Sequence, residues 1–428
     1  MKTLFTQRSQ GKGDLTLPPS KSHTQRALFF ALMGRGVSTI QNYLPSPDIR
    51  AMLQAIQEFG AKVIFQDEKT ISILGCAGKL ESAQNVIDAG NSGQVLRFIG
   101  ALASLLPTYT VITGDLSIRH NRPVKPLLEG IRQLGGFAES MQLNDTAPIL
   151  LRGPIKAGKV FIDGECSQPV SGLLMACSFL PSPTEIIVHN GKEKPWIRLT
   201  LAWMDRLGLT YKEDNLEKFT VYGKGQYDGF TVNIQGDMSS AAFPVAAALI
   251  TKSELCLYNV DRGGSQGDEK VFDDLISMGA HITFCPLKNT LTVKNTGELL
   301  GGTLDVNDCI DAVPILSVLG CFCKNPLILI NGKAARKKES DRIHCMAIEL
   351  TKMGAHIEEK EDSLVIFPSI LKGTKLSSHK DHRVAMSLAV AGLGASDITE
   401  IEDVDCIEKS YPLFINEMQR LGFLVTEK

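Results

Sequence analysis

A sixfold repeat of a glycine-ended helix is the feature that most limits what this chain can fold into. In each copy an amphipathic stretch ends in a large apolar residue. A glycine comes next, and a strand-like stretch follows the glycine. The six glycines are Gly60, Gly135, Gly208, Gly279, Gly354 and Gly422, a spacing of 68 to 75 residues. Such a period indicates a repeated supersecondary unit. Because glycine tolerates the left-handed conformation, each is expected just after its helix ends.

A polar loop that opens into an apolar stretch of small residues also occurs six times. The apolar stretches are 27–33, 95–103, 170–175, 241–250, 312–319 and 384–391. They are apolar nearly all round, which is typical of buried helices. Each repeat is therefore predicted to run strand, buried helix, strand, outer helix, strand, strand. Strands that alternate with helices in this way place the chain in the α/β class.

The chain is predicted to form two domains of three repeats each. Six units of about seventy residues are too many for one hydrophobic core, and the natural division of the 428 residues lies near Gln235 and Gly236. The strand expected at 13–17 could belong to either half. Short crossovers would act as a hinge, with a cleft between the halves. If the buried helices within a half are parallel, their N-termini meet on one face, where anions are favoured.

Composition excludes several classes of function. The formal net charge of -2 and the sequence pI near 6.5 argue against a protein that binds nucleic acid or acidic membranes. Clusters of Lys and Arg would then serve small anions. No apolar run approaches the roughly 18 residues of a membrane span, and the start lacks the features of a signal peptide. The ten cysteines are scattered without a C-x-x-C pair, so packing in a reducing cytoplasm is favoured over metal binding.

Several charged loops precede predicted helices, and each has a plain and a functional interpretation. The loop 20–26, Ser-Lys-Ser-His-Thr-Gln-Arg, opens into a buried helix; it is either a serine cap with solvated charges or an anion site. The stretches 338–342 and 409–412 precede outer helices, and 381–383 opens the last buried helix. Asp311 is either an N-cap or a functional carboxylate. At 121–123, Pro123 is expected at the first helical position, beside Arg122.

The motifs at these loops resemble those of a known family. L-P-P-S-K-S-x-x-x-R-A, G-N-S-G, R-P, S-Q, G-D-x-S-S-A, K-E-S-D-R, D-H-R-x-A-M and K-S-Y-P occur in the order found in the EPSP synthase family of the shikimate pathway. The resemblance covers about residues 13–424. It implies a two-domain inside-out α/β barrel, three βαβαββ repeats per domain, with the active site in the interdomain cleft. The domains would be 20–235, and 1–19 with 236–428.

The resemblance also implies a reaction and a set of site residues. The family transfers the carboxyvinyl group of phosphoenolpyruvate to the 5-hydroxyl of shikimate-3-phosphate and releases phosphate. Residues implied for binding shikimate-3-phosphate are Lys21, Ser22, Arg26, Cys166, Ser167, Gln168, Asp311 and Lys338. Those implied for phosphoenolpyruvate are Lys21, Gly93, Arg122, Gln168, Arg342, Arg383 and Lys409. The implied catalytic residues are Asp311, Glu339, Lys21 and His382. The resemblance implies no metal and no organic cofactor, and the chain is expected to be a cytoplasmic monomer.

The chain departs from the family pattern near the expected phosphate site. The usual Ser-Ser-Gln reads Cys166-Ser167-Gln168, and a thiol is a poorer donor than a hydroxyl. Where the family usually has Ser-Lys-Pro-Tyr, this chain reads Glu193-Lys194-Pro195-Trp196. A carboxylate at position 193 would repel a nearby phosphate. The family usually has an Asn four residues before the lysine of K-E-S-D-R, and this chain has Ala334 at that position.

Two other functions are weighed against the family reaction. The sister carboxyvinyltransferase, which acts on a UDP-amino sugar, usually carries a reactive Cys before its Arg-Pro; here residues 119–121 read Arg-His-Asn. An anion-binding protein without activity is disfavoured because both candidate proton-transfer carboxylates are present.

Overall fold

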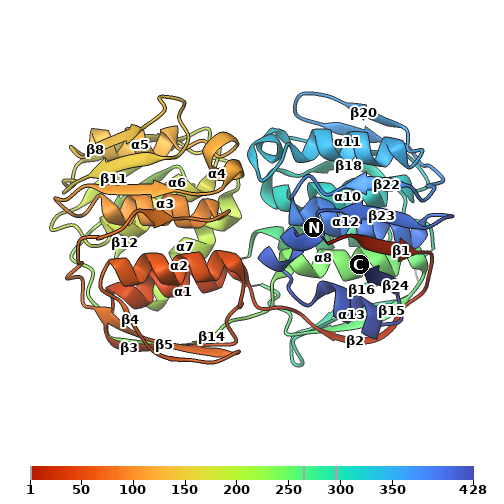
Figure 1. Cartoon of the computed structure of the whole chain (residues 1–428), viewed down its shortest axis with the longest axis horizontal. Helices are drawn as coiled ribbons and strands as arrows, with labels where there is room; N and C mark the ends of the chain where they lie inside the picture. Colours follow the sequence, from red (N-terminus) through yellow and green to blue (C-terminus); the bar gives the residue numbers. More distant parts are fainter. Residues whose placement is uncertain (1, 264–265, 295–296) are drawn as a thin grey trace. The chain divides into compact units, whose positions relative to one another are not determined.

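The computed structural model describes residues 2–263, 266–294 and 297–428. These form two compact units. The N-terminal unit is Pro19–Ile234, and the C-terminal unit joins the residues up to Pro18 to Gln235–Lys428. Each unit has its own hydrophobic core, and the elements of both can be followed in Figure 1. No helix among the described residues is long and apolar enough to cross a membrane.

The N-terminal unit contains three repeats built on three buried helices. The buried helices are α1 (Lys21–Met33), α3 (Gly93–Ala103) and α6 (Ser167–Cys177). The outer helices are α2 (Pro47–Glu58), α5 (Lys125–Gln133) and α7 (Lys194–Arg206), and a short α4 (Leu116–His120) precedes α5. Contacts join α3 to α6 and α1 to α3. This unit has three four-stranded sheets, and the first two strands of each are parallel while the others pair antiparallel.

The strands of the N-terminal unit follow one order in all three sheets. The first sheet has the order β14 (Thr231–Asn233), β3 (Arg35–Gln41), β5 (Thr70–Cys76), β4 (Lys62–Gln66). The second has β6 (Ile87–Asp88), β7 (Thr110–Thr113), β9 (Ile149–Arg152), β8 (Phe137–Ser140). The third has β10 (Lys159–Asp163), β11 (Thr184–His189), β13 (Lys218–Val221), β12 (Tyr211–Asp214).

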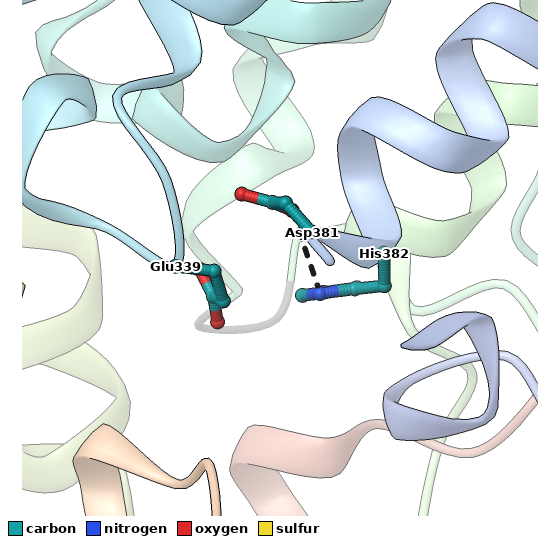
Figure 2. A group of neighbouring side chains, drawn as sticks. All are labelled: Glu339, Asp381 and His382. Atoms are coloured by element: carbon teal, nitrogen blue, oxygen red, sulfur yellow. Dashed lines mark ion pairs between the residues drawn. The ribbon is translucent and has the colours of Figure 1, made fainter. Parts of the chain in front are cut away.

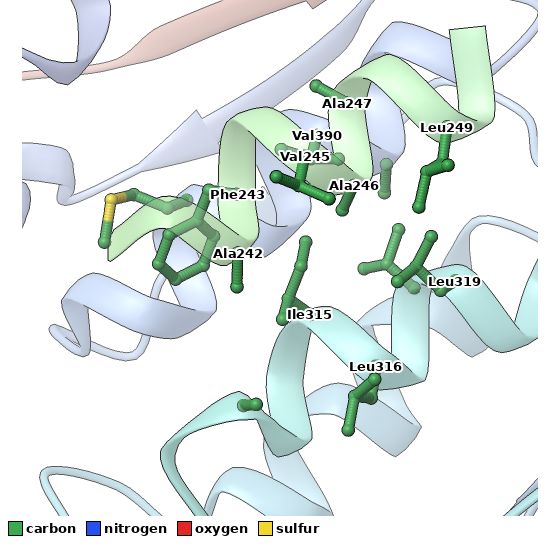
Figure 3. Packing of buried hydrophobic residues seen from close by; sticks show 14 of the residues in the cluster. Ala242, Phe243, Val245, Ala246, Ala247, Leu249, Ile315, Leu316, Leu319 and Val390 are labelled. Carbon is green, nitrogen blue, oxygen red and sulfur yellow. The ribbon is translucent and has the colours of Figure 1, made fainter. Parts of the chain in front are cut away.

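The C-terminal unit repeats this plan. Its buried helices are α8 (Met238–Thr251), α10 (Val313–Cys321) and α12 (His382–Gly394), and its outer helices are α9 (Lys270–Ser277), α11 (Arg342–Lys352) and α13 (Phe414–Arg420). Short 3₁₀ helices are η1 (Gly267–Glu269), η2 (Asn307–Ala312), η3 (Lys333–Lys337) and η4 (Val404–Lys409). Figure 3 shows side chains of α8, such as Ala246, and of α10, such as Leu319, pointing into the space between the two helices.

The sheets of the C-terminal unit take in both ends of the chain. Their orders are β16 (Ile282–Cys285), β17 (Thr290–Val293), β15 (Glu254–Tyr258), β2 (Lys12–Thr16); then β18 (Gly302–Asp305), β19 (Leu327–Ile330), β21 (Leu364–Ile366), β20 (Ile357–Glu359); then β22 (Lys375–Ser377), β23 (Thr399–Glu402), β1 (Leu4–Gln7), β24 (Leu424–Glu427). The strand expected at 13–17 is β2, and it pairs in parallel with β15, within the C-terminal unit. The sequence did not indicate β1, which pairs antiparallel with both β23 and β24.

All six repeat glycines adopt the left-handed conformation predicted for them. Their φ angles lie between 68° at Gly208 and 103° at Gly60. Each directly follows the residue that ends an outer helix, as Gly60 follows Phe59 after α2. A side chain at these positions would be strained, which explains why glycine recurs at this point of every repeat.

Candidate functional site

The start of each buried helix in the C-terminal unit carries a polar residue, and these residues meet. Ser239 is the second residue of α8, Asp311 lies in η2 directly before α10, and Arg383 is the second residue of α12. Arg383 Nη2 lies 3.2 Å from Asp311 Oδ2, and its Nη1 lies 3.8 Å from Asp268 Oδ2. Ser239 Oγ donates to the same Asp268 oxygen. The N-termini of α8, α10 and α12 therefore converge within this unit.

Arg342 connects three carboxylates at this point. Its Nη1 donates to Asp311 Oδ1 at 2.6 Å and its Nη2 to Glu339 Oε2 at 2.7 Å. Its Nε donates to Asp381 Oδ2 at 2.8 Å, and Nη2 also reaches Asp381 Oδ1 at 3.3 Å. Lys409, the last residue of η4, donates to Glu339 Oε1 at 2.7 Å. The guanidinium is 1% exposed, so this is a buried ion network.

The charges of the network shift the pKa values of Asp311 and Asp268 in opposite directions. Burial acts to raise the pKa of Asp311, but Arg383, Lys338 and Arg342 outweigh it and hold that pKa well below its usual range. Burial and the nearby Asp311 charge raise the pKa of Asp268 to about 7, although Arg383 opposes them. Burial acts to lower the pKa of Arg342, but Asp381, Glu339 and Asp311 raise it well above its usual value. Asp311 is thus ionised at neutral pH.

His382 lies beside two of these carboxylates, as Figure 2 shows. His382 Nδ1 is 3.6 Å from Asp381 Oδ1. Ligand atoms of Glu339, Asp381 and His382 lie within 4.8 Å of one another, a spacing that a metal ion could bridge. However, Arg342 and Lys409 already neutralise the two carboxylates. The donor set therefore fits proton transfer better than metal binding.

The structure corrects several sequence-based interpretations of these loops. In the stretch 338–342, Lys338, Ser340 and Arg342 are buried, so the solvated-surface interpretation is wrong for them. Asp311 is not the N-cap of α10, because Ala312 takes that position. In the N-terminal unit Pro123 is not at the first position of α5, which begins at Lys125.

The predicted carboxylate site in the N-terminal unit is built around a buried arginine. Arg26 donates from Nε to Thr200 Oγ1 at 2.9 Å, and from its two Nη atoms to the carbonyl oxygens of Ser22 and Trp196, each at 3.1 Å. Its side chain stacks over Phe98 at 5.0 Å. No carboxylate pairs with it among the described residues. Burial lowers the pKa of Arg26 to about 9. An anion bound beside this guanidinium would neutralise its charge.

Three of the residues of the N-terminal unit that are predicted to bind phosphate, Gly93, Arg122 and Gln168, lie together. A Cβ atom at Gly93, the first residue of α3, would lie 3.1 Å from Gln168 Oε1 and 3.6 Å from Arg122 Nη1. It would also lie 2.7 Å from Arg97 Nη1, so a side chain at this position would have to displace that guanidinium. Arg122 is buried, which excludes the solvated interpretation. Gln94 Nε2 donates to Ser22 Oγ at 3.1 Å. The starts of α1, α3 and α6 therefore also converge.

Sequence reasoning missed three buried charged residues that hold the predicted ones. Arg97 donates to the carbonyl oxygens of Gly93 and Pro123, and to Gln168 Oε1 at 2.8 Å. Asp48 lies 3.3 Å from Lys21 Nζ. Asp268 contacts Arg383 as described above. The signal for Arg97 was available, because it is the one charge in the apolar stretch 95–103; Asp48 and Asp268 stand in polar contexts that give no such signal.

The residues at the start of α6 are held differently from the expectation. Cys166 is the N-cap of α6, but its side chain makes no capping hydrogen bond. Glu193 Oε2 instead accepts hydrogen bonds from the Ser167 N–H at 3.1 Å and from Ser167 Oγ at 3.0 Å.

Lys338 is buried in the C-terminal unit, near enough to Asp311 to lower the pKa of that carboxyl.

Comparison with known proteins identifies the family. The EPSP synthase (3-phosphoshikimate 1-carboxyvinyltransferase) family model matches residues 5–418. The 3-phosphoshikimate 1-carboxyvinyltransferase of Chlamydia caviae is 39% identical over 417 residues, covering 97% of this chain and 92% of that protein. That of Acetivibrio thermocellus is 41% identical over 419 residues, 98% of each. A solved EPSP synthase structure from Acinetobacter baumannii matches all of both chains at 25% identity, with a TM-score of 0.84. The chain therefore belongs to the EPSP synthase family and is an α/β enzyme of the 3-phosphoshikimate 1-carboxyvinyltransferase class.

Proposed function

We propose that this chain transfers the carboxyvinyl group of phosphoenolpyruvate to the 5-hydroxyl of shikimate-3-phosphate and releases phosphate, using the residues assembled above. Family membership supports the reaction. One observation supports its assignment to these residues above all. Arg342 holds the carboxylates of Asp311 and Glu339 at two nitrogens of one guanidinium, so two acid–base groups flank a cationic centre. That arrangement suits a reaction in which one proton leaves a hydroxyl and another is added to a carbon.

Shikimate-3-phosphate would be held through its two anionic groups. Arg26 and Ser22 would bind the carboxylate, because the buried guanidinium has no acidic partner among the described residues. Ser167 at the start of α6 would bind the 3-phosphate, with Cys166 contributing its backbone and Gln168 close by. Lys21 and Lys338 would add positive charge.

Phosphoenolpyruvate would be held by two sets of cations. Its phosphate would lie near Gly93, Arg122 and Gln168, which the structure brings together, with Lys21 and Lys409 also binding it. Arg342 and Arg383 would bind its carboxylate, for which a planar guanidinium is suited. Because both arginines already bind acidic side chains, the substrate carboxylate would share or displace those partners.

The chemistry follows from the charges. Asp311 stays ionised and would accept the proton of the 5-hydroxyl as its oxygen attacks the central carbon of phosphoenolpyruvate. Glu339, with Lys21 and His382, would handle the proton that is added to the methylene carbon, and this addition gives a tetrahedral ketal. Loss of phosphate and of one methyl proton would then form the product double bond. No step requires a metal or an organic cofactor.

The chain is further proposed to act as a monomer in the cytoplasm. A mass measurement by light scattering during gel filtration would test the first point.

The reaction is tested by measuring phosphate release with two acceptors. Purified enzyme should release phosphate from phosphoenolpyruvate when shikimate-3-phosphate is present and not when UDP-N-acetylglucosamine replaces it. The reverse result would show the sister activity, and release with neither would contradict catalysis. Family membership disfavours the sister activity.

A further inference from the structure

Glu193 occupies the donors of Ser167 as an internal anion. One carboxylate oxygen, Oε2, accepts both the N–H and the Oγ–H of Ser167, at 3.1 and 3.0 Å. Both residues are 2% exposed, so water does not weaken these bonds. Ser167 is the first residue of α6, where unpaired N–H groups and the helix dipole favour negative charge. The carboxylate is therefore well stabilised where it lies.

The backbone of Glu193 is strained in a way that serves this contact. Its φ of 52° and ψ of 35° are left-handed, a conformation that is unfavourable for a residue other than glycine. It immediately precedes α7, but its side chain makes no capping bond to that helix. Instead the side chain reaches the neighbouring helix α6. Strain that is retained at a binding loop is a reason to look for a functional role.

We propose that Glu193 competes with the 3-phosphate of shikimate-3-phosphate for Ser167 and thereby limits the affinity of the enzyme for this substrate. The proposal rests on the assignment of Ser167 to the phosphate made above. The N–H and the hydroxyl of Ser167 each carry one proton, so carboxylate and phosphate oxygens cannot both accept them well. The two anions would also repel each other at this distance. The carboxylate must therefore leave Ser167 before the phosphate binds there.

The proposal predicts an unusual effect of removing the carboxylate. Glu193→Ser should bind shikimate-3-phosphate about tenfold more tightly, since a hydrogen bond to a charged group contributes that much or more. Glu193→Gln keeps the shape and an acceptor but loses the charge, so it should bind the substrate about threefold more tightly. Titration calorimetry gives both dissociation constants. Shikimate without its phosphate should bind all three proteins alike, because the competition involves the phosphate alone.

Melting temperature separates competition from a purely structural role. Loss of the bonds to Ser167 should lower the melting temperature of Glu193→Ser while its affinity rises. A residue that only supports the loop would lower both. Glu165→Gln is the matched control, because it removes a negative charge two residues before Ser167, whose N–H and hydroxyl both donate to Glu193. It should change the affinity for shikimate-3-phosphate less than twofold.

The outcomes distinguish the proposal from its premise. Weaker or unchanged binding of shikimate-3-phosphate by both Glu193 variants would overturn the competition, provided that Ser167→Ala weakens that binding. If Ser167→Ala leaves it unchanged, the phosphate is not held by Ser167 and the proposal falls with that assignment. In either case, turnover of shikimate-3-phosphate by the unmodified enzyme would leave the proposed reaction intact.

Discussion

Arg342 and Asp381 form a bidentate ion pair inside the C-terminal unit, with Nε to Oδ2 at 2.8 Å and Nη2 to Oδ1 at 3.3 Å. Their side chains are 1% and 0% exposed. Asp381 also accepts the N–H of Arg383 at 2.9 Å, as the N-cap of α12, and Ser340 Oγ at 3.1 Å. One carboxylate thus fixes the start of a buried helix and the guanidinium that bridges Asp311 and Glu339.

Replacing Asp381 by alanine should strongly destabilise the protein. Breaking a buried ion pair from one side costs about 3–5 kcal/mol, because the remaining charge loses its partner. Asp311 and Glu339 still neutralise Arg342, so we expect the low end, about 3 kcal/mol. Urea unfolding measures the free energy. Glu361→Ala, which breaks the exposed pair with Lys333, is the control and should change it by less than about 1 kcal/mol. Equal effects of the two variants would contradict a structural role for the buried pair.

Replacing Arg383 by lysine should weaken the binding of phosphoenolpyruvate. Lysine keeps the charge but loses the planar fork that fits a carboxylate. The KM for phosphoenolpyruvate should rise at least about tenfold, which corresponds to about 1.4 kcal/mol. Arg336→Lys is the matched control, since Arg336 pairs with Asp341 and Glu359, neither of which is assigned to a substrate. An unchanged KM in Arg383→Lys would remove Arg383 from the site.

Repeats made the fold readable from the sequence. The recurring glycine, as at Gly60, and the apolar stretches, as at 241–250, marked outer and buried helices, since one conformational requirement and one burial pattern return in every unit. The strand β1 escaped notice because four residues without a turn signal carry little pattern. Its partners, β23 and β24, lie about four hundred residues away in sequence.

Motifs placed the site residues, but their partners had to come from the structure. A charged triplet such as 381–383 signals a helix start, whereas the pairing of Arg383 with Asp268 depends on how two distant loops meet. The same holds for Glu193, whose identity suggested only repulsion of phosphate. The structure shows instead that it binds the serine predicted to hold that phosphate.

Asp311 should be needed for catalysis rather than for folding. Its pKa is held well below the usual range, because Arg383, Lys338 and Arg342 outweigh burial, so it stays ionised as a base. Asp311→Ala should lower kcat by roughly 10²–10⁴, the usual contribution of a general acid–base group. Asp308→Asn, in the same 3₁₀ helix, is the control and should keep its activity. Near-normal kcat with a lower melting temperature in Asp311→Ala would show a structural role alone.

Glu339 should act on the proton that is exchanged at the methylene carbon of phosphoenolpyruvate. Glu339→Gln should lower kcat by roughly 10²–10⁴ as well, with loss of solvent deuterium incorporation into the methylene group of phosphoenolpyruvate. Its carboxylate is held by Arg342 and Lys409, so the neutral amide should retain the local packing. Glu358→Gln, at an exposed position of β20, is the control. Deuterium exchange that persists at the normal rate in Glu339→Gln would assign this proton to another group.

Finally, His379 should make stability depend on pH above neutrality. Hydrogen bonds with Cys345 and with Glu349, at 2.8 Å, raise the pKa of His379 from 6.5 to about 9. Glu349 also binds Lys352 and the N–H of Ser377, so it fixes the loop that leads to α12.

Because the folded state holds the His379 proton more tightly than the unfolded state, this stabilisation is complete below about pH 6.5 and is lost as the pH rises through about 9. The melting temperature should therefore fall from pH 6.5 to 9.5 by more in the unmodified protein than in His379→Gln. The exposed residue His189 supplies the control, since His189→Gln should follow the unmodified curve. Parallel curves for the unmodified protein and His379→Gln would show that the proton on His379 does not stabilise the loop.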